Sequence, residues 1–218
     1  MITFYDIACV SVSLVTRLLG NIEVRGLENL PRTGAVIIAP NHLHLTDPPI
    51  LGAFLPRKIY YMAKQEAWDH PFLGLLSRWF EAFPVRRGEA DRSAYRRALQ
   101  VLSEGKALGI FPEGHRSPTG YLQPARPGAI ILAQRSGAPI VPVGMWGIRE
   151  ILSWPGVLQR RTLHIVVGEP YHPPPCRREE LPILAHDLMV RIAALLPPEH
   201  RFPPAPVGSG SRPEASPP

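Results

Sequence analysis

Cysteine is scarce in this chain of 218 residues, which contains only Cys9 and Cys176. The two lie far apart in sequence, and their setting matches no zinc-binding or redox motif. We therefore expect two reduced thiols in an intracellular protein and no disulfide framework. At this length the chain can form one domain with a sizeable core without covalent cross-links.

Long apolar runs are also missing. The longest near the N-terminus spans residues 7–16, about half of the roughly 20 residues that a helix needs to cross a bilayer. Asp6 and Arg17 flank this run and no basic segment precedes it, unlike a cleaved signal peptide. We expect residues 1–20 to form a short helix, which either lies in a membrane interface or packs on the domain's own core.

The signatures of several enzyme and binding classes are absent. The sequence has no G-x-S-x-G elbow, no P-loop, no dinucleotide-binding G-x-G-x-x-G and no H-E-x-x-H zinc motif. It also has no zinc-finger spacing, recognition-helix pattern or aromatic RNA-binding signature. The chain is nevertheless basic, with a net charge of +6. An anionic membrane surface is therefore favoured over nucleic acid as its partner.

Apolar segments of strand length alternate with amphipathic segments of helix length between residues 21 and 196. This alternation predicts a layered α/β sandwich, in which helices flank a largely parallel mixed sheet. Strands are expected at residues 22–25, 35–39, 58–63, 82–85, 107–111, 139–145 and 162–167, with helices starting near residues 48, 69, 91, 127 and 179. Residues 197–218 are rich in proline, glycine and serine and are expected to be a disordered tail.

A histidine and an aspartate bracket the loop after the predicted strand at residues 35–39. Asp47 precedes Pro48 and an apolar run, which predicts Asp47 as the N-cap of a helix. With His42 leaving a strand and Asp47 opening a helix, the loop can bring the two side chains together. A carboxylate on one imidazole nitrogen would leave the other free to take a proton. His44 competes for this role, and the spacing alone is also compatible with chance.

A second candidate site follows the predicted strand at residues 107–111. Gly114 permits a sharp turn or a close approach to a ligand. Arg116 offers a planar guanidinium that can grip a phosphate, and Glu113 can accept from a substrate hydroxyl or hold the arginine. An ordinary turn with a surface ion pair explains the same residues.

A third candidate is the arginine pair Arg86 and Arg87, which ends the extended segment at residues 82–85. Two adjacent arginines suit a phosphate group or an anionic surface. A solvated basic turn is the alternative interpretation.

Taken in order, these segments resemble the motifs of the glycerolipid acyltransferase family, which includes 1-acylglycerol-3-phosphate acyltransferases. The resemblance extends from about residue 26 to residue 167. Its four motifs are N-H-x-x-x-x-D at Asn41, His42 and Asp47; A-F-P-V-R-R-G at residues 82–88; F-P-E-G-H-R-S at residues 111–117; and V-P-V at residues 141–143.

The resemblance implies an acyl transfer without a covalent enzyme intermediate. His42 would be the general base that takes the proton of an acceptor hydroxyl, and Asp47 would orient it. The donor would be acyl-CoA or acyl carrier protein, with no cofactor and no metal ion. General-base assistance of this kind is typically worth about 10²- to 10⁴-fold in rate.

The same resemblance assigns the substrate-binding residues. Arg87 and Arg116, with Arg86 beside them, would bind the acceptor phosphate, and Glu113 would hold the glycerol part. Pro142 would help to shape the acyl or acceptor cleft. We therefore expect an enzyme that acylates 1-acylglycerol-3-phosphate to phosphatidic acid and associates peripherally or monotopically with the cytoplasmic face of a membrane.

Three positions depart from the family's usual residues. His44 replaces a common serine, His115 a threonine and Glu81 a glycine. These changes leave the expected acyl transfer intact, but they do not determine which acceptor the enzyme uses. A different lyso-lipid acceptor, or a non-catalytic lipid-binding protein with the same fold, remains an alternative.

Overall fold

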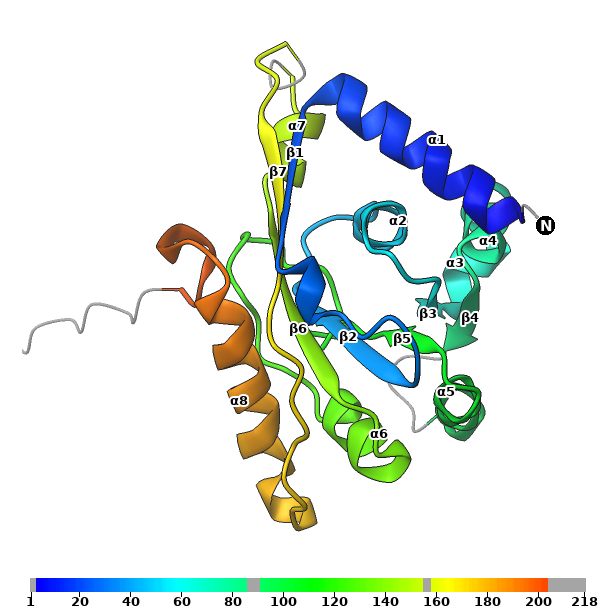
Figure 1. Cartoon of the computed structure of the whole chain (residues 1–218), viewed down its shortest axis with the longest axis vertical. Coiled ribbons are helices and arrows are strands. Elements are labelled where there is room, and N and C mark those ends of the chain that lie inside the picture. Colours follow the sequence, from blue (N-terminus) through cyan, green and yellow to red (C-terminus); the bar gives the residue numbers. More distant parts are fainter. Residues whose placement is uncertain (1–2, 86–90, 155–157, 204–218) are drawn as a thin grey trace, which may run out of the picture.

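The computed structural model describes residues 3–85, 91–154 and 158–203. Its described strands form one sheet in the order β1-β7-β6-β2-β5-β3-β4 (Figure 1). All neighbouring strands are parallel except β6 and β7, which confirms the predicted mixed, largely parallel sheet. The strands are β1 (Asn21–Arg25), β2 (Val36–Pro40), β3 (Ile59–Lys64), β4 (Ala82–Val85), β5 (Ala107–Gly109), β6 (Ile140–Trp146) and β7 (Thr162–Val167).

The α-helices lie close to the predicted positions, with local sequence signals at several ends. Asp91 caps α5 by accepting hydrogen bonds from the N–H groups of Ser93 and Ala94, and Gly137 ends α6 in a left-handed conformation. The sequence did not predict the two five-residue helices α3 and α7. The helices are α1 (Phe4–Leu19), α2 (Asp47–Phe54), α3 (Gln65–Asp69), α4 (Pro71–Trp79), α5 (Arg92–Ser103), α6 (Gly128–Ser136), α7 (Ile148–Leu152) and α8 (Leu181–Ala194).

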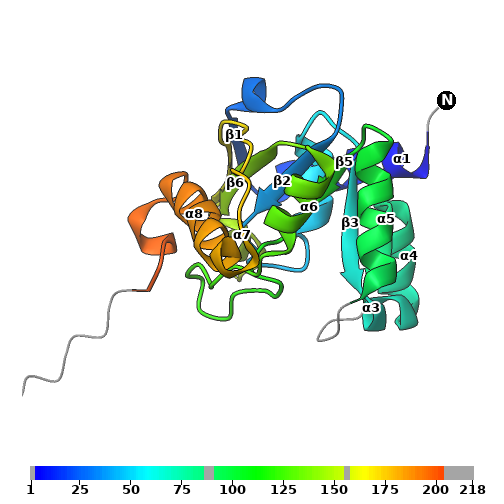
Figure 2. The ribbon, with the colours of Figure 1, turned by 90° about the horizontal axis from the view of Figure 1, so that it is seen from below.

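Helices cover both faces of the sheet. Successive side chains of a strand point to opposite faces, so Ile37 and Ala39 of β2 pack in the core with α5, α6 and α8. Val36 and Ile38 pack in a second core with α1, α2 and α7. Figure 2 shows α5, α6 and α8 on one side of the sheet. β2 is buried along its whole length and fixes the loop that follows it.

The N-terminal helix α1 packs on the domain. Tyr5 is buried against Phe80, with the rings 5.9 Å apart, and its hydroxyl accepts a hydrogen bond of 3.1 Å from the Ile59 N–H. The expectation of a helix packed on the core therefore holds for its inner face. Within the described residues, no helix has the length and apolarity needed to span a membrane.

The described chain continues past the boundary expected at residue 196. Pro198–His200 form a 3-10 helix, and the Leu122 N–H donates a hydrogen bond of 3.0 Å to the Arg201 carbonyl. The side chain of Arg201 in turn donates to the Leu196 carbonyl over 2.8 Å. Residues 197–203 are thus tied to the domain, and the rest of the expected tail, 204–218, lies outside the described residues.

The direction of the strands determines where the loops meet. β2, β3, β5 and β6 are mutually parallel through their shared neighbours. Their carboxyl ends therefore lie along one edge of the sheet, where ligand loops of α/β proteins gather. The segments that follow β2, β5 and β6 meet at this edge.

Candidate active site

His42 and Asp47 form the buried centre of this edge. His42 Nδ1 lies 2.8 Å from Asp47 Oδ2, and the two residues are 8% and 0% exposed. This confirms that the loop brings them together. Because a carboxylate only accepts, a proton on Nδ1 completes this hydrogen bond, and a ring in that tautomer presents Nε2 as an acceptor.

Asp47 reaches His42 because its carboxylate turns back into the loop. Its Oδ2 also accepts from the N–H groups of Leu43 and His44, over 2.7 and 2.8 Å. The N-cap of α2 is Thr46, and Asp47 is the first helical residue. The prediction that Asp47 caps the helix was wrong, because the carboxylate points back into the loop: Oδ2 accepts from His42 and the loop N–H groups, and Oδ1 has no hydrogen-bond partner among the described residues.

His44 has different partners from His42. Its Nδ1 lies 2.9 Å from Thr46 Oγ1 and accepts from the Thr46 N–H over 3.3 Å. Burial lowers the pKa of His44, and the charges of Arg116 and Arg149 lower it further against the opposing effect of Asp47. Only the backbone of His44 bonds to the Asp47 carboxylate, so the geometry favours His42 as the oriented base.

Two neighbours fix the ring and the backbone of His42. The Phe111 ring stacks on the imidazole with centroids 4.0 Å apart and planes 27° from parallel. The Asn41 side chain exchanges two hydrogen bonds with the Met145 backbone, of 2.9 and 2.7 Å. The loop is thereby attached to β6 where β2 ends.

Glu113 is placed behind His42 and not in the open site. Its Oε1 accepts from the His42 N–H over 2.8 Å, and its Oε2 accepts from the Gln123 N–H over 3.1 Å. Burial raises the pKa of Glu113 to about 7, although both N–H groups act in the opposite direction. At 1% exposure, Glu113 has no surface for the glycerol contact expected from sequence. It holds the backbone of His42.

The remaining predicted residues of this segment lie around a turn. Gly114 has φ +73°, a conformation that favours glycine, and a Cβ there would lie 3.0 Å from Arg126 Cδ. Arg116 is exposed and lines a cavity together with His42. Arg86 and Arg87, the third predicted group, lie outside the described residues.

The cavity beside His42 has a volume of about 340 Å³. Its charged lining residues are Arg116, Lys64 and Glu66, and Lys64 pairs with Glu66 over 2.8 Å. Most of the other lining is apolar. Sequence reasoning missed Lys64; its position at the end of β3, on the same edge as His42, was the available signal.

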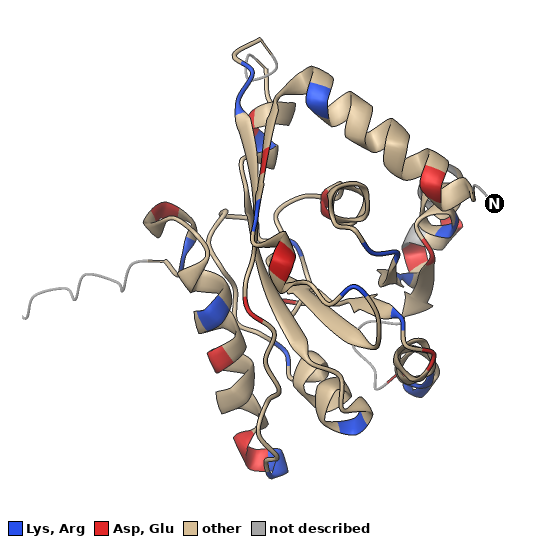
Figure 3. Ribbon diagram, in the orientation of Figure 1, with Lys and Arg blue, Asp and Glu red and all other residues tan. Residues whose placement is uncertain are grey.

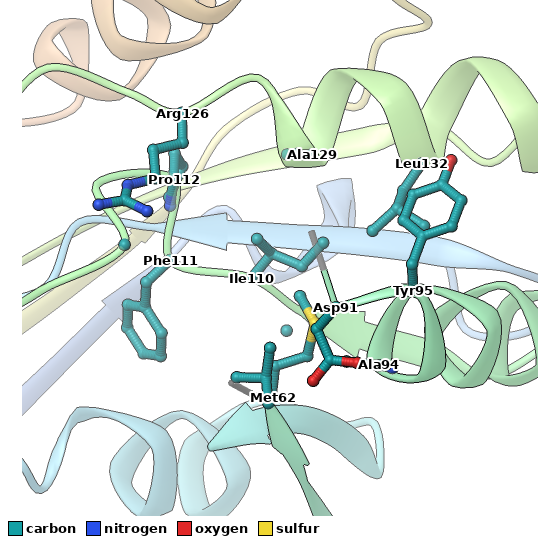
Figure 4. Close-up of a pocket in the computed structure, with 14 residues that line it drawn as sticks. Met62, Asp91, Ala94, Tyr95, Ile110, Phe111, Pro112, Arg126, Ala129 and Leu132 are labelled. Carbon is teal, nitrogen blue, oxygen red and sulfur yellow. Dashed lines mark hydrogen bonds between the residues drawn. The ribbon is translucent and has the colours of Figure 1, made fainter. Parts of the chain in front are cut away.

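A second cavity, of about 310 Å³, lies on the other side of Phe111. Figure 4 shows its labelled side chains, which come from β3, α5, the segment after β5 and α6. Met62 and Phe111 line both cavities and so stand between them. Gly114 lines this second cavity and not the one beside His42.

Arg149 of α7 joins the two loops of the site, and sequence reasoning missed it. Its Nε and Nη2 lie 3.3 and 3.2 Å from the Leu43 carbonyl. Nη2 also donates to the Ser117 carbonyl, and Nη1 to that of Pro118 over 3.5 Å. No sequence motif marks Arg149, since α7 itself was not predicted.

Pro142 lies away from both cavities. It is a buried residue within β6, opposite Ala39 of β2, and its carbonyl accepts from the Gly168 N–H over 2.9 Å. Pro142 is not among the residues that line the cavity on either side of Phe111. The expected role in the cleft is not supported by this position.

The departures at positions 81 and 115 leave the buried pair untouched. Glu81 has φ +52°, a conformation that favours glycine and explains the family's usual residue there. Its carboxylate lies 2.5 Å from Lys58 Nζ, so this added acid is paired with a lysine. His115 is exposed.

Comparison with known proteins identifies the family of this chain. The acyltransferase family model matches residues 21–146, a range that contains both His42 and Asp47. The chain belongs to the acyltransferase family. The 1-acyl-sn-glycerol-3-phosphate acyltransferase of Bacillus subtilis is 31% identical over 169 residues, covering 77% of this chain and 82% of that protein.

Two further relatives extend the comparison. The 1-acyl-sn-glycerol-3-phosphate acyltransferase of Pseudomonas aeruginosa is 28% identical over 168 residues, covering 72% of this acyltransferase and 63% of its relative. The crystal structure of the 1-acyl-sn-glycerophosphate acyltransferase PlsC from Thermotoga maritima matches with a TM-score of 0.70 at 23% identity, covering 88% of this chain and 78% of that one. That structural likeness shows a shared fold.

Proposed function

We propose that this acyltransferase moves a fatty acyl group from acyl-CoA or acyl carrier protein to the free hydroxyl of 1-acylglycerol-3-phosphate, giving phosphatidic acid. The observation that carries the proposal is the buried His42–Asp47 pair beside a cavity that also has Arg116 on its wall. The names of the Bacillus and Pseudomonas relatives support the acceptor.

The proposed reaction uses His42 twice. Nε2 takes the proton of the acceptor hydroxyl as its oxygen bonds to the thioester carbonyl carbon. The tetrahedral intermediate then collapses, the carbon–sulfur bond breaks, and the imidazolium returns the proton to the leaving sulfur. Asp47 keeps the proton on Nδ1 and stabilises the imidazolium. The thioester is already activated, so holding both substrates together supplies much of the remaining rate.

The proposed acceptor phosphate binds among cations at the mouth of the His42 cavity. Arg116 offers a planar guanidinium suited to phosphate oxygens, and Lys64 adds a second cation on the wall. Arg87 and Arg86 belong to this group by the family resemblance. The apolar wall made by Leu76, Phe80 and Phe111 suits an acyl chain.

The proposed location is the membrane surface on its cytoplasmic face, with peripheral or monotopic attachment. α1 carries only two charged residues, Asp6 and Arg17, as Figure 3 shows. Its outward side chains form an apolar stripe, each 53–72% exposed: Phe4, Ile7, Val10, Leu14, Val15 and Leu18. An apolar face of this kind is suited to lie in the interface of a bilayer.

A panel of acceptors tests the proposed substrate. Purified enzyme is given a thioester donor and lyso-lipids with or without a phosphomonoester, and release of free thiol or carrier is followed. We expect the phosphomonoester to give the highest kcat/KM. Arg116→Gln should lower that advantage by roughly tenfold or more, because a charged hydrogen bond is worth about 1.5–3 kcal/mol.

The matched control is Arg25→Gln, whose side chain is 71% exposed on β1 and pairs with Glu23. It should leave the preference unchanged. An equal rate with phosphate-free acceptors would instead support another lyso-lipid acceptor. Binding of lyso-lipid with no thiol release from any pair would favour the non-catalytic alternative.

A further inference from the structure

An apolar groove runs along one flank of α1. Its volume is about 330 Å³, and it is lined by residues of α1, α2, α4 and α7 together with the N-cap residue Thr46. On α1 the lining extends from Ser11 to Leu19, about 12 Å along the axis of an α-helix. Figure 1 shows α1 above α2, with α7 near one end of α1 and α4 near the other. The groove is thus elongated and suits an extended ligand.

The polar side chains of the groove are already bonded within the protein. The hydroxyls of Ser11 and Thr16 donate to carbonyls one turn earlier on α1, over 2.9 and 2.7 Å. Thr46 Oγ1 lies 2.9 Å from His44 Nδ1. The other residues that line the groove are apolar, and none of its lining residues is charged. A ligand that binds here is therefore itself apolar, because a polar one would lose its hydrogen bonds to water.

The groove adjoins the cavity beside His42. Pro49 and Leu76 line both hollows, so the two meet at these side chains. The cations Arg116 and Lys64 line the His42 cavity and not the groove. A molecule with its anionic end at these cations and its hydroxyl at His42 therefore has a path for an apolar remainder past Pro49 and Leu76.

The groove also adjoins the exposed apolar stripe of α1. Val15, which is 53% exposed, belongs to that stripe and lines the groove, and Ser11, one turn before it, is exposed as well. The acyl chain of a lyso-lipid acceptor starts within the bilayer, whereas a chain carried by coenzyme A or acyl carrier protein is brought from the aqueous side. A groove whose rim is part of the proposed membrane contact therefore suits the acceptor chain.

We propose that this groove holds the existing acyl chain of the 1-acylglycerol-3-phosphate acceptor. This inference rests on the proposed function, in which the hydroxyl of the acceptor meets His42 and its phosphate meets the cations of the same cavity. The chain passes from the bilayer into the groove without crossing water. Its apolar surface stays covered while the head group reaches the buried base.

Binding of two acceptors in the absence of a donor tests the proposal. Isothermal titration calorimetry with the full chain compares 1-oleoylglycerol-3-phosphate with its 1-hexanoyl counterpart, below the concentrations at which either forms micelles. Wild type should bind the oleoyl acceptor more tightly. Ser11→Phe places a ring in the groove and should weaken oleoyl binding by roughly tenfold or more, since each buried methylene is worth about fourfold in affinity. Hexanoyl binding should change by less than about twofold, because the shorter chain ends within the His42 cavity.

Ser13→Phe is the matched control, because it adds the same ring to the opposite flank of α1. Residues two apart on a helix lie about 200° apart around its axis, and Ser13 is not among the residues that line the groove. This variant should bind both acceptors as wild type does. Ser11→Ala keeps the groove open and should also retain oleoyl binding, which separates filling of the groove from loss of the hydroxyl. Circular dichroism confirms that each variant is folded.

Several results would overturn the proposal. These are an equal loss for both acceptors, the same loss in Ser13→Phe, and wild-type affinity that does not depend on chain length. Weaker binding of oleoyl-CoA, and not of the oleoyl acceptor, by Ser11→Phe would assign the groove to the donor and overturn the proposal too.

The readout is independent of turnover. Acceptor binding is measured without acyl transfer, so failure of thiol release with every acceptor would refute the proposed reaction alone. Equal oleoyl binding by wild type and Ser11→Phe would refute the assignment of the groove alone.

Discussion

Hydrogen bonds hold the ring, the backbone N–H and the carbonyl of His42. Asp47 fixes Nδ1, Glu113 accepts from the backbone N–H, and the Ser117 N–H donates to the His42 carbonyl over 2.8 Å. The Phe111 ring closes one face. With so many contacts on one residue, Nε2 is left as the part of the ring that is free for a substrate.

Asp47→Asn should remove most of the activity while keeping the loop. In the wild type one oxygen, Oδ2, accepts from Leu43, His44 and His42 together. An amide oxygen in its place can keep these bonds, but the negative charge that stabilises the imidazolium is lost. We expect kcat to fall about 10²- to 10⁴-fold, measured by thiol release. Asp187→Asn, at an exposed ion pair on α8, is the control, and equal activity of the two variants would contradict the assignment.

The raised pKa of Glu113 predicts how the stability of the fold changes with pH. Its folded pKa of about 7 lies above the ordinary value of 4.5, so the folded state binds the proton more tightly. The stabilisation that the protonated Glu113 gives to the folded state is full below pH 4.5 and is lost as pH rises through 7. From pH 5 to 8, wild type should lose roughly 2–3 kcal/mol of unfolding free energy more than Glu113→Gln. Urea unfolding measures both, and parallel profiles would contradict the raised pKa.

At the scale of elements, the direction of the strands determines where the site forms. β2 and β5 are parallel neighbours, so the loops that follow them meet side by side. The sequence patterns predicted both strands and both loops, including the meeting of His42 with Asp47. The sequence patterns did not predict which backbone N–H groups would donate to the carboxylates of Asp47 and Glu113. Asp47 and Glu113 both bind loop N–H groups, because loop donors buried at this edge must be satisfied.

The short helix α7 could not be predicted from its sequence. Five residues are too few to establish a helical period, and its position depends on β6 running into the same edge as β2. Arg149 therefore carried no signal of its own. Its partners lie 106, 32 and 31 residues away, a separation that only the folded sheet reveals.

Arg149→Met should loosen the two catalytic loops. The variant keeps an apolar stem but leaves the carbonyls of Leu43, Ser117 and Pro118 without these donors, at a cost of about 1–3 kcal/mol. We expect kcat to fall more than KM changes, since the base is misplaced while the cations remain. Arg149→Lys should recover only part of kcat, because an ammonium lacks the planar fork.

Urea unfolding and steady-state kinetics give the two readouts for Arg149. Arg25→Met is the comparison, with an expected change below about 1 kcal/mol for a surface pair. A loss of stability without any change in kcat would show that Arg149 supports the fold alone.

The whole molecule combines a buried His42–Asp47 pair with an exposed apolar face on α1. The exposed stripe of α1 continues through Phe4, whose ring stacks on Trp79 of α4 with centroids 6.4 Å apart. Composition predicted a basic chain with a short apolar helix. The division of α1 into an inner and an outer apolar face became clear only once α2 and α4 were placed against it.

Ile7→Ser/Leu14→Ser should release the protein from vesicles. These side chains are 54% and 59% exposed, so the change removes apolar surface from the interface with little effect on the core. We expect at least tenfold weaker binding, on the basis of about 1.5–3 kcal/mol for each fully buried side chain. Flotation of vesicles measures it. Retention of wild-type binding would show that α1 is not the membrane contact.

The most direct test of the central claim is thiol release from an acyl thioester in the presence of 1-acylglycerol-3-phosphate, comparing wild type with His42→Ala. The variant removes the group that accepts the hydroxyl proton while Asp47 and the cations around Arg116 remain. We predict a loss of about 10²-fold or more in kcat, with vesicle binding and the fold retained. Full turnover by His42→Ala would contradict the account.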